Sequence, residues 1–170
     1  MGLNRETIFL IGFMGSGKTT VGQELAKELG YEFKDLDAFI VESVEKTIPE
    51  IFTKYGEKGF RKLEKKALKE LTVKSNVVAT GGGVIETEGT LGWMRNNGIA
   101  IFLDAPFDIL YERIKEDKNR PLSSIGEKEL LGRYEKRKPL YDQAPFAVDT
   151  NEKTVQQIVQ EIHLLLKKKE

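Results

Sequence analysis

The chain has 170 residues, no cysteine, one histidine, and 27 basic against 27 acidic side chains; 39% of its residues are hydrophobic. This length favours one compact domain, so we expect residues 1–170 to form a single domain. Zero net charge excludes the broad positive field of generic nucleic-acid or anionic-membrane binders, so any anion site must be local. The absence of cysteine excludes disulfides, thiolate nucleophiles and zinc–cysteine sites, and a single histidine disfavours a histidine-built metal site.

The sequence carries no signal for export or membrane insertion. Residues 1–7 are short and polar, unlike a signal peptide. No apolar run approaches the ~20 residues that a membrane span needs. We therefore expect a cytoplasmic protein with no membrane partner, and the lack of cysteine fits a reducing compartment.

Short apolar runs alternate with helix-period sequence along the chain. The first run, residues 8–11, ends in glycine and is followed by a helical pattern that closes at Gly30. Further short runs lie at residues 33–37, 76–79, 99–103 and 146–149, and helical patterns lie at residues 57–71, 107–114 and 155–166. Strands that alternate with helices predict an α/β fold with a parallel sheet covered on both faces.

The most specific signal is a phosphate-binding loop. Residues 12–19 match G-x-x-x-x-G-K-[ST] in full, between an expected strand and an expected helix. Its glycines let backbone amides curl around a phosphate, and the helix that follows adds its positive end. Lys18 would reach the outer phosphates, the Thr19 hydroxyl would coordinate magnesium, and Thr20 would lie near the inner phosphates.

Two other nucleotide-binding classes fit poorly. A dinucleotide fingerprint needs glycine or alanine where Thr20 stands, so a nicotinamide enzyme is disfavoured. A switch GTPase would be expected to carry an Asn-Lys-x-Asp guanine motif late in the chain, and residues 150–153 do not supply it.

Two aspartates follow the expected second strand. Asp35 and Asp37 are one residue apart, and on an extended strand such side chains point to opposite faces. One carboxylate could face magnesium and its waters, and the other an acceptor hydroxyl. The alternative is that Asp37 caps the helix that follows.

Next come a possible ion pair and three successive glycines. Arg61 and Glu64 are three apart on a helix, which gives either an ordinary surface pair or a device that aims the guanidinium. Gly81, Gly82 and Gly83 end the third strand, where we expect a ligand to lie against bare backbone. A plain loop is the alternative.

The stretch at residues 115–126 is charged and then polar, with little apolar content to anchor it. It predicts a mobile lid over an active site, with an idle loop as the alternative. Arg120 within it, and Arg137 further on, supply guanidinium groups suited to phosphate and carboxylate. A single arginine usually lies on the surface without binding a ligand. Arg120 and Arg137 together with Lys18 and Arg61, however, predict a site for small anions.

In this order and combination the motifs resemble the shikimate kinase family over residues 8–153. The resemblance is carried by the phosphate loop, the glycine triplet and residues 33–37, 48–52, 56–64, 120–122 and 137–141. It implies a single P-loop kinase domain of the nucleoside-monophosphate-kinase-like class. This three-layer P-loop NTPase fold has a five-stranded parallel sheet flanked by helices on both faces, a lid at about residues 115–126, and a substrate-binding helical segment at about residues 37–64.

The resemblance also implies an activity. It is transfer of the terminal phosphoryl group of ATP, with Mg²⁺, to the 3-hydroxyl of shikimate, on the route to chorismate and the aromatic amino acids. The partner would be the small molecule alone, with no nucleic acid, and the protein would be a monomer. Two alternatives stay open: a kinase of another small polyol acid such as gluconate, and a non-catalytic nucleotide-binding module. The latter would be expected to have lost Lys18, Thr19, Asp37 or Arg61, and all four are present.

Roles carried over by position complete the prediction. The ATP phosphates would be bound by Gly15, Ser16, Gly17, Lys18, Thr19 and Thr20, with Arg113 and Lys153 near the adenine. Magnesium would be held by Thr19 and, through water, by Asp35. Shikimate would be bound by Asp37, Arg61, Gly81, Gly82, Gly83 and Arg137. Lys18, Asp37 and Arg120 would be catalytic, with Arg120 closing onto the phosphates.

Overall fold

A five-stranded parallel sheet forms the centre of the computed structural model, which describes residues 6–117 and 125–169. The strands are β1 (Thr7–Ile11), β2 (Glu32–Asp35), β3 (Asn76–Ala79), β4 (Gly98–Asp104) and β5 (Phe146–Asp149), in the spatial order β2-β3-β1-β4-β5. In the central strand, Phe9 pairs with Val78 on one side and Ala100 on the other. The predicted α/β fold with five parallel strands is confirmed.

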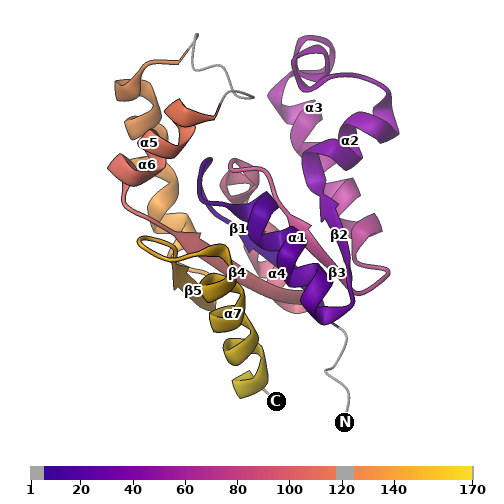
Figure 1. Cartoon of the computed structure of the whole chain (residues 1–170). Coiled ribbons are helices and arrows are strands. Elements are labelled where there is room, and N and C mark those ends of the chain that lie inside the picture. Colours follow the sequence, from indigo (N-terminus) through magenta and orange to yellow (C-terminus); the bar gives the residue numbers. More distant parts are fainter. Residues whose placement is uncertain (1–5, 118–124, 170) are drawn as a thin grey trace.

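Helices cover both faces of the sheet (Figure 1). They are α1 (Lys18–Leu29), α2 (Leu36–Val44), α3 (Ile48–Leu71), α4 (Thr90–Asn97), α5 (Phe107–Glu116), α6 (Glu127–Tyr141) and α7 (Val155–Lys169), with a short 3-10 turn, η1 (Val84–Glu86). Within the described residues, none of these helices is long and apolar enough to cross a membrane.

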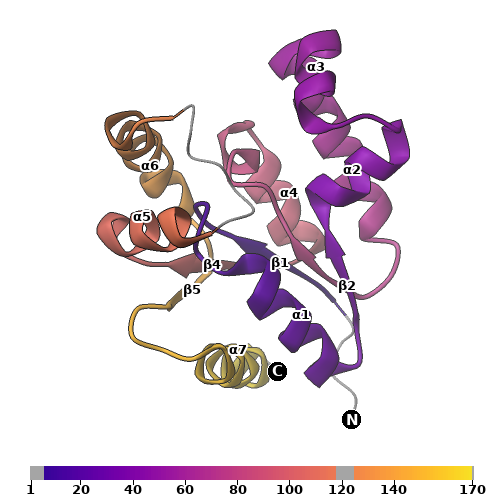
Figure 2. The ribbon, with the colours of Figure 1, turned by 45° about the horizontal axis from the view of Figure 1, so that its top comes forward.

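Alternation along the strands divides the core between the two faces. Ile8 and Leu10 pack into a cluster with α1 and α7, whereas Phe9 and Ile11 pack into the cluster on the opposite face. Figure 2 shows α1 and α7 side by side below the sheet. Because the central strand β1 is buried on both faces, Ile8, Phe9, Leu10 and Ile11 are all apolar, without the alternation of apolar and polar residues seen in a half-exposed strand.

The carboxyl ends of the strands form the functional edge. β1 is the central strand, with β3 and β2 on one side of it and β4 and β5 on the other. In such sheets ligands bind at the carboxyl ends of the strands, at the switch point where the strand order reverses. The loop after β1 runs into α1, β2 runs directly into α2, and β3 runs into the glycine triplet. Above this edge α2 and α3 stand on one side and α5 and α6 on the other (Figure 1).

Several predicted boundaries were wrong. α3 begins at Ile48 because Thr47 and Glu50 form a capping box, and a kink at Gly56 (φ 69°) interrupts the periodicity that had suggested a start at residue 57. α5 runs to Glu116, so the first two residues of the predicted lid are helical. Residues 118–124 of the lid, including Arg120, lie outside the described residues.

Candidate active site

The phosphate-binding loop forms at the predicted place, between β1 and α1. Gly15 (φ 81°) and Gly17 (φ 93°) adopt left-handed backbone, and Gly17 is the N-cap of α1. Among the described residues no side-chain hydrogen bond caps this helix start, an arrangement in which a helix N-terminus can receive an anion. The Lys18 ammonium donates to the carbonyls of Gly12 (2.6 Å) and Phe13 (3.0 Å), which folds it over the loop.

A cavity of about 730 Å³ opens beside this loop. Its described walls combine backbone of the loop, hydroxyls, three carboxylates, a lysine and an arginine: Met14, Gly15, Gly17, Lys18, Thr19, Thr20, Asp35, Asp37, Thr80, Gly81, Gly82, Arg113 and Asp117. Most of the residues predicted to bind ATP and magnesium therefore meet in one space. Ser16 is the exception within the loop, since it is buried beneath it.

The two aspartates lie differently from the sequence-based expectation. Asp35 ends β2 and is the N-cap of α2, where its Oδ1 accepts from the Ala38 N–H at 3.0 Å. Asp37 sits in the first helical turn, so the cap is Asp35 and not Asp37. The chain leaves the strand at Leu36, which ends the strand alternation, and both carboxylates line the same cavity.

Asp35 also brings a second oxygen to Thr19. Its Oδ2 lies 3.5 Å from the Thr19 hydroxyl, at the rim of the phosphate-binding loop. Among the described residues no group of three or more His, Cys, Asp or Glu side chains could enclose a metal ion. One hydroxyl and one carboxylate fit Mg²⁺ that arrives with phosphate oxygens, since this ion keeps several waters and needs few protein ligands.

Arg61 and Arg137 converge from opposite sides of the cleft. Arg61 comes from α3 and Arg137 from α6, and Arg137 is only 9% exposed. Both guanidinium groups approach the point where a Cβ on Gly83 would lie, with Arg137 Nη2 3.1 Å from it and Arg61 Nη2 closer still. Glycine at position 83 thus leaves room for the two guanidinium groups to approach the backbone.

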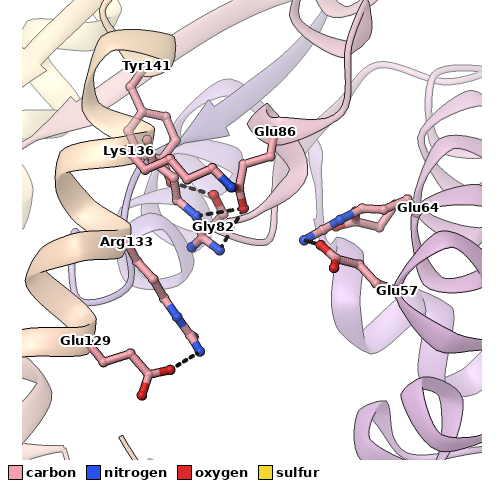
Figure 3. Close-up of polar contacts among 10 residues, drawn as sticks. Glu57, Glu64, Gly82, Glu86, Glu129, Arg133, Lys136 and Tyr141 are labelled. Atoms are coloured by element: carbon pink, nitrogen blue, oxygen red, sulfur yellow. Dashed lines mark hydrogen bonds and ion pairs between the residues drawn. The ribbon is translucent and has the colours of Figure 1, made fainter. Parts of the chain in front are cut away.

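Each arginine is held by carboxylates of the protein. Arg61 Nη1 lies 2.6 Å from Glu64 Oε1 on the same helix, and Arg137 Nη2 lies 3.1 Å from Glu86 Oε2. In Figure 3, Glu57 and Glu64 lie on one side of the opening, and Glu86 and Lys136 lie on the other. These pairs fix where the guanidinium groups point.

Glu64 is the buried member of these pairs, at 2% exposure. Burial raises the pKa of its carboxyl to about 7, against the opposing effect of the Arg61 contact, and the nearby Asp37 adds to the increase. Because the folded state holds this proton more tightly than the unfolded chain, ionisation of Glu64 lowers stability as pH rises from about 4.5 to about 7.

Glu86 and Tyr141 complete the α6 side, and sequence reasoning missed both. Partial burial works to raise the pKa of the Glu86 carboxyl, but Lys136 and Arg137 together hold it below its ordinary value. The Tyr141 hydroxyl donates to the Gly82 carbonyl, and burial raises its pKa. Tyr141 lies in residues 137–141, which carry part of the family resemblance, but no role was predicted for it. Glu86 follows the glycine triplet without any local signal, because its partners lie about 50 residues away on α6.

Two predicted nucleotide residues take different positions. Arg113 lines the cavity and joins two loops, donating to the carbonyls of Gly15 (3.3 Å) and Thr150 (3.2 Å). Lys153 pairs with Glu161 of α7 at 2.8 Å and is not among the described lining residues of the cavity. Arg113 thus lines the cavity, whereas Lys153 lies outside its described lining, and a nucleotide-binding role for either residue stays a prediction.

The glycine triplet connects the two halves of the site. At Gly81, a Cβ would lie 3.0 Å from Asp37 Oδ1, beside the phosphate-loop cavity, whereas at Gly83 it would meet the two arginines. Along one short backbone segment the site therefore offers a phosphate cradle, a carboxylate and a cationic clamp. This arrangement can hold a nucleoside triphosphate and a small carboxylic acid with its hydroxyl toward the phosphates.

Comparison with known proteins agrees with this geometry. The sequence profile of the family described as shikimate kinase matches residues 14–167. A shikimate kinase from Persephonella marina is 44% identical over 91% of this chain and 95% of its own length. The structure of a shikimate kinase from Acinetobacter baumannii in complex with shikimate superposes with a TM-score of 0.89 at 39% identity, covering 99% of this chain and 96% of that one.

A more distant structural neighbour bears on the fold alone. A gluconokinase from Sinorhizobium meliloti has a TM-score of 0.68 at 20% identity, over 96% of this chain and 93% of its own. The profile match includes residues 14–19 of the phosphate loop, the glycine triplet, Arg61 and Arg137, and the 44% identical relative covers 91% of the chain. The chain belongs to the shikimate kinase family.

Proposed function

We propose that this protein transfers the terminal phosphoryl group of ATP to the 3-hydroxyl of shikimate, giving shikimate 3-phosphate and ADP. One observation carries the proposal: the glycine triplet joins the phosphate-loop cavity and Asp37 to a pair of converging arginines. Shikimate has one carboxylate, three hydroxyls and no base, so arginines, an aspartate and bare backbone are sufficient to recognise it. In the same proposal the protein acts as a cytoplasmic monomer on the route to the aromatic amino acids.

The residues divide into two binding sets. On the nucleotide side are the amides of Gly15 to Thr20, with Lys18 at the outer phosphates and Arg113 at the nucleoside end. On the acceptor side, Arg61 and Arg137 hold the carboxylate, while Asp37 and the backbone of Gly81, Gly82 and Gly83 hold the ring hydroxyls. Arg120 lies outside the described residues, and only the family likeness assigns it to the phosphates. The same likeness assigns the lid to residues 115–126 and the acceptor-binding segment to residues 37–64.

The chemistry is in-line substitution at phosphorus. Asp37 orients the 3-hydroxyl and takes its proton as the oxygen bonds to the terminal phosphorus, and the bond from that phosphorus to the bridging oxygen of ADP breaks. Lys18 and the loop amides stabilise the charge on the phosphoryl oxygens, which is the dominant contribution in phosphoryl transfer. Thr19 and Asp35 would hold Mg²⁺, which supplies further charge neutralisation on the phosphates when bound.

Acceptor dependence tests the proposal. ADP formation is measured in a coupled assay with shikimate, with gluconate and with no acceptor. We expect turnover with shikimate and only background with the other two. Robust turnover with gluconate would support the polyol-acid alternative, and nucleotide binding without any transfer would support the non-catalytic alternative.

Magnesium dependence tests the assignment of Asp35. Asparagine is also a good N-cap, so Asp35→Asn should keep α2 in place while removing the charge beside Thr19. We expect the Mg²⁺ concentration for half-maximal rate at fixed ATP to rise about tenfold or more, as for loss of an outer-sphere metal partner. The exposed Glu32→Gln on the same strand is the control. An unchanged magnesium titration for Asp35→Asn would remove Asp35 from the metal site.

Gly83→Ala tests the clamp without touching either arginine. The new methyl group would lie against Arg61 Nη2 and 3.1 Å from Arg137 Nη2, which are flexible side-chain ends, so the clamp opens while the fold survives. We expect the KM for shikimate to rise by about one to two orders of magnitude with little change in the KM for ATP. Gly92→Ala on α4, which meets nothing within 4 Å, is the control. Equal kinetics for the two variants would contradict the clamp.

A further inference from the structure

Glu64 occupies an unusual position between the two halves of the acceptor site. Its Oε1 accepts from Arg61, but its Oε2 is buried and has no hydrogen-bond partner among the described residues. Oε2 lies 3.4 Å from the position of a Cβ on Gly81, next to the Asp37 carboxylate on the same side. An ionised carboxylate in that place can only accept hydrogen bonds, and its nearest charged neighbour on that side is another carboxylate.

The carboxylate of bound shikimate would add one more negative charge beside Arg61 and Glu64. Arg61 is already shared between Glu64 at 2.6 Å and the exposed Glu57 at 3.8 Å. A substrate carboxylate that takes the outer face of Arg61 displaces Glu57 into water at little cost. Glu64, at 2% exposure, cannot leave, so Arg61 would have to neutralise two carboxylates at once.

Among the described residues, Arg61 is the cation in direct contact with Glu64. Arg61 on α3, Asp37 on α2 and Arg137 on α6 act on its charge. The partners of the two arginines, Glu57 on α3 and Glu86 on η1, lie around the same opening, and Lys136 on α6 also pairs with Glu86. Arg137 and Lys136 are both paired with Glu86, and Arg133 on α6 is paired with Glu129. Lys58, Lys62 and Lys65 line the open outer cavity beside Arg61, where water screens them. The substrate carboxylate would therefore add a negative charge beside Glu64 and Asp37 without bringing a further cation.

We propose that Glu64 takes up a proton when shikimate binds, so that Arg61 passes from an internal carboxylate to the carboxylate of the substrate. This inference rests on the proposed function. Protonation removes the negative charge of Glu64 and allows its buried Oε2 to become a hydrogen-bond donor beside Asp37. Glu64 is in this sense a positioning residue, because it acts on the substrate through Arg61.

The titration of Glu64 agrees with this exchange. In the protein without substrate, burial raises the pKa of Glu64 to about 7, and Arg61 is the main group that lowers it. A bound carboxylate offsets the charge of Arg61 and excludes water, and both effects raise the pKa further. At pH 8 Glu64 is therefore mostly ionised before binding and protonated after it, so binding weakens as pH rises through this range.

Proton uptake by the unaltered protein is the primary test. Heats of shikimate binding are measured by calorimetry at pH 8 in buffers of different ionisation enthalpy, and the slope gives the protons exchanged. We expect uptake of roughly 0.5 to 1 proton per site, and a Kd for shikimate that rises up to about tenfold per pH unit above pH 7. Tight binding with no proton uptake would overturn this inference alone, whereas no binding of shikimate at any pH would overturn the proposed function.

Two variants assign the proton. Glu64→Gln keeps an acceptor for Arg61 and supplies a permanent donor at the other position, so proton uptake should fall to near zero and the Kd should become flat between pH 7 and 8.5. Glu57→Gln removes the exposed partner of the same arginine and should keep the uptake of the unaltered protein. Undiminished uptake in Glu64→Gln, or its loss in Glu57→Gln, would place the proton elsewhere and contradict the assignment.

Discussion

Replacing Asp37 with asparagine is expected to lower kcat for shikimate phosphorylation by about two to four orders of magnitude, the usual contribution of a positioned proton acceptor. Asparagine keeps the size of the side chain and its contacts at Gly81 but cannot take the proton of the hydroxyl. Steady-state kinetics with both substrates measure the effect, and the KM for ATP should change little because the phosphate-loop amides are untouched.

A matched aspartate provides the control for this variant. Asp108 also sits in the first turn of a helix, α5, but is exposed and is not among the described cavity residues. Asp108→Asn removes the same charge from the same kind of helix position and should leave kcat near normal. If Asp37→Asn is folded and behaves like Asp108→Asn, Asp37 has no role in the chemistry.

Removing the Arg61 side chain should lower kcat/KM for shikimate by nearly as large a factor, because it weakens substrate binding. Loss of one partner of a buried, hydrogen-bonded charge pair typically costs about 2–5 kcal/mol, which corresponds to about a 30-fold to several-thousand-fold loss of kcat/KM for shikimate. Arg61→Ala also leaves Glu64 buried without its cation, so part of any loss could come from destabilisation.

A double variant separates these two effects. In Arg61→Ala/Glu64→Gln the stranded carboxylate is gone, so thermal stability should recover relative to the single variant while kcat/KM for shikimate stays low. Arg95→Ala on the exposed surface of α4 is the arginine control. Recovery of activity together with stability in the double variant would show that Arg61 supports the fold and does not bind substrate.

The elements that could be predicted from the sequence are those whose signal is local. The phosphate loop, its strand and its helix lie within residues 7–29, and α1 ends at Leu29, capped by Gly30 in left-handed backbone, as expected from a glycine stop. The glycine triplet was also informative, because a Cβ at Gly81 or Gly83 would meet functional side chains. In each case a few neighbouring residues determine the outcome.

The remainder depends on contacts between distant segments. α6 was not predicted, because its charged residues leave few apolar positions for a helical stripe and Pro139 lies inside it. Glu86 acquires its role only when α6 brings Arg137 and Lys136 to η1. The direction of the Asp37 side chain depends on where β2 changes into α2, which is at Leu36. Residue propensities and hydrophobic alternation cannot locate such a boundary to a single residue.

The position of the transferred phosphate tests the central claim most directly. The product formed from ATP and shikimate is examined by phosphorus-31 NMR with proton coupling, which identifies the ring carbon that carries the phosphate. We predict a single phosphomonoester coupled to the proton at carbon 3, formed in equal amount to ADP. Inorganic phosphate as the only new species, or a phosphate on another hydroxyl, would contradict the account.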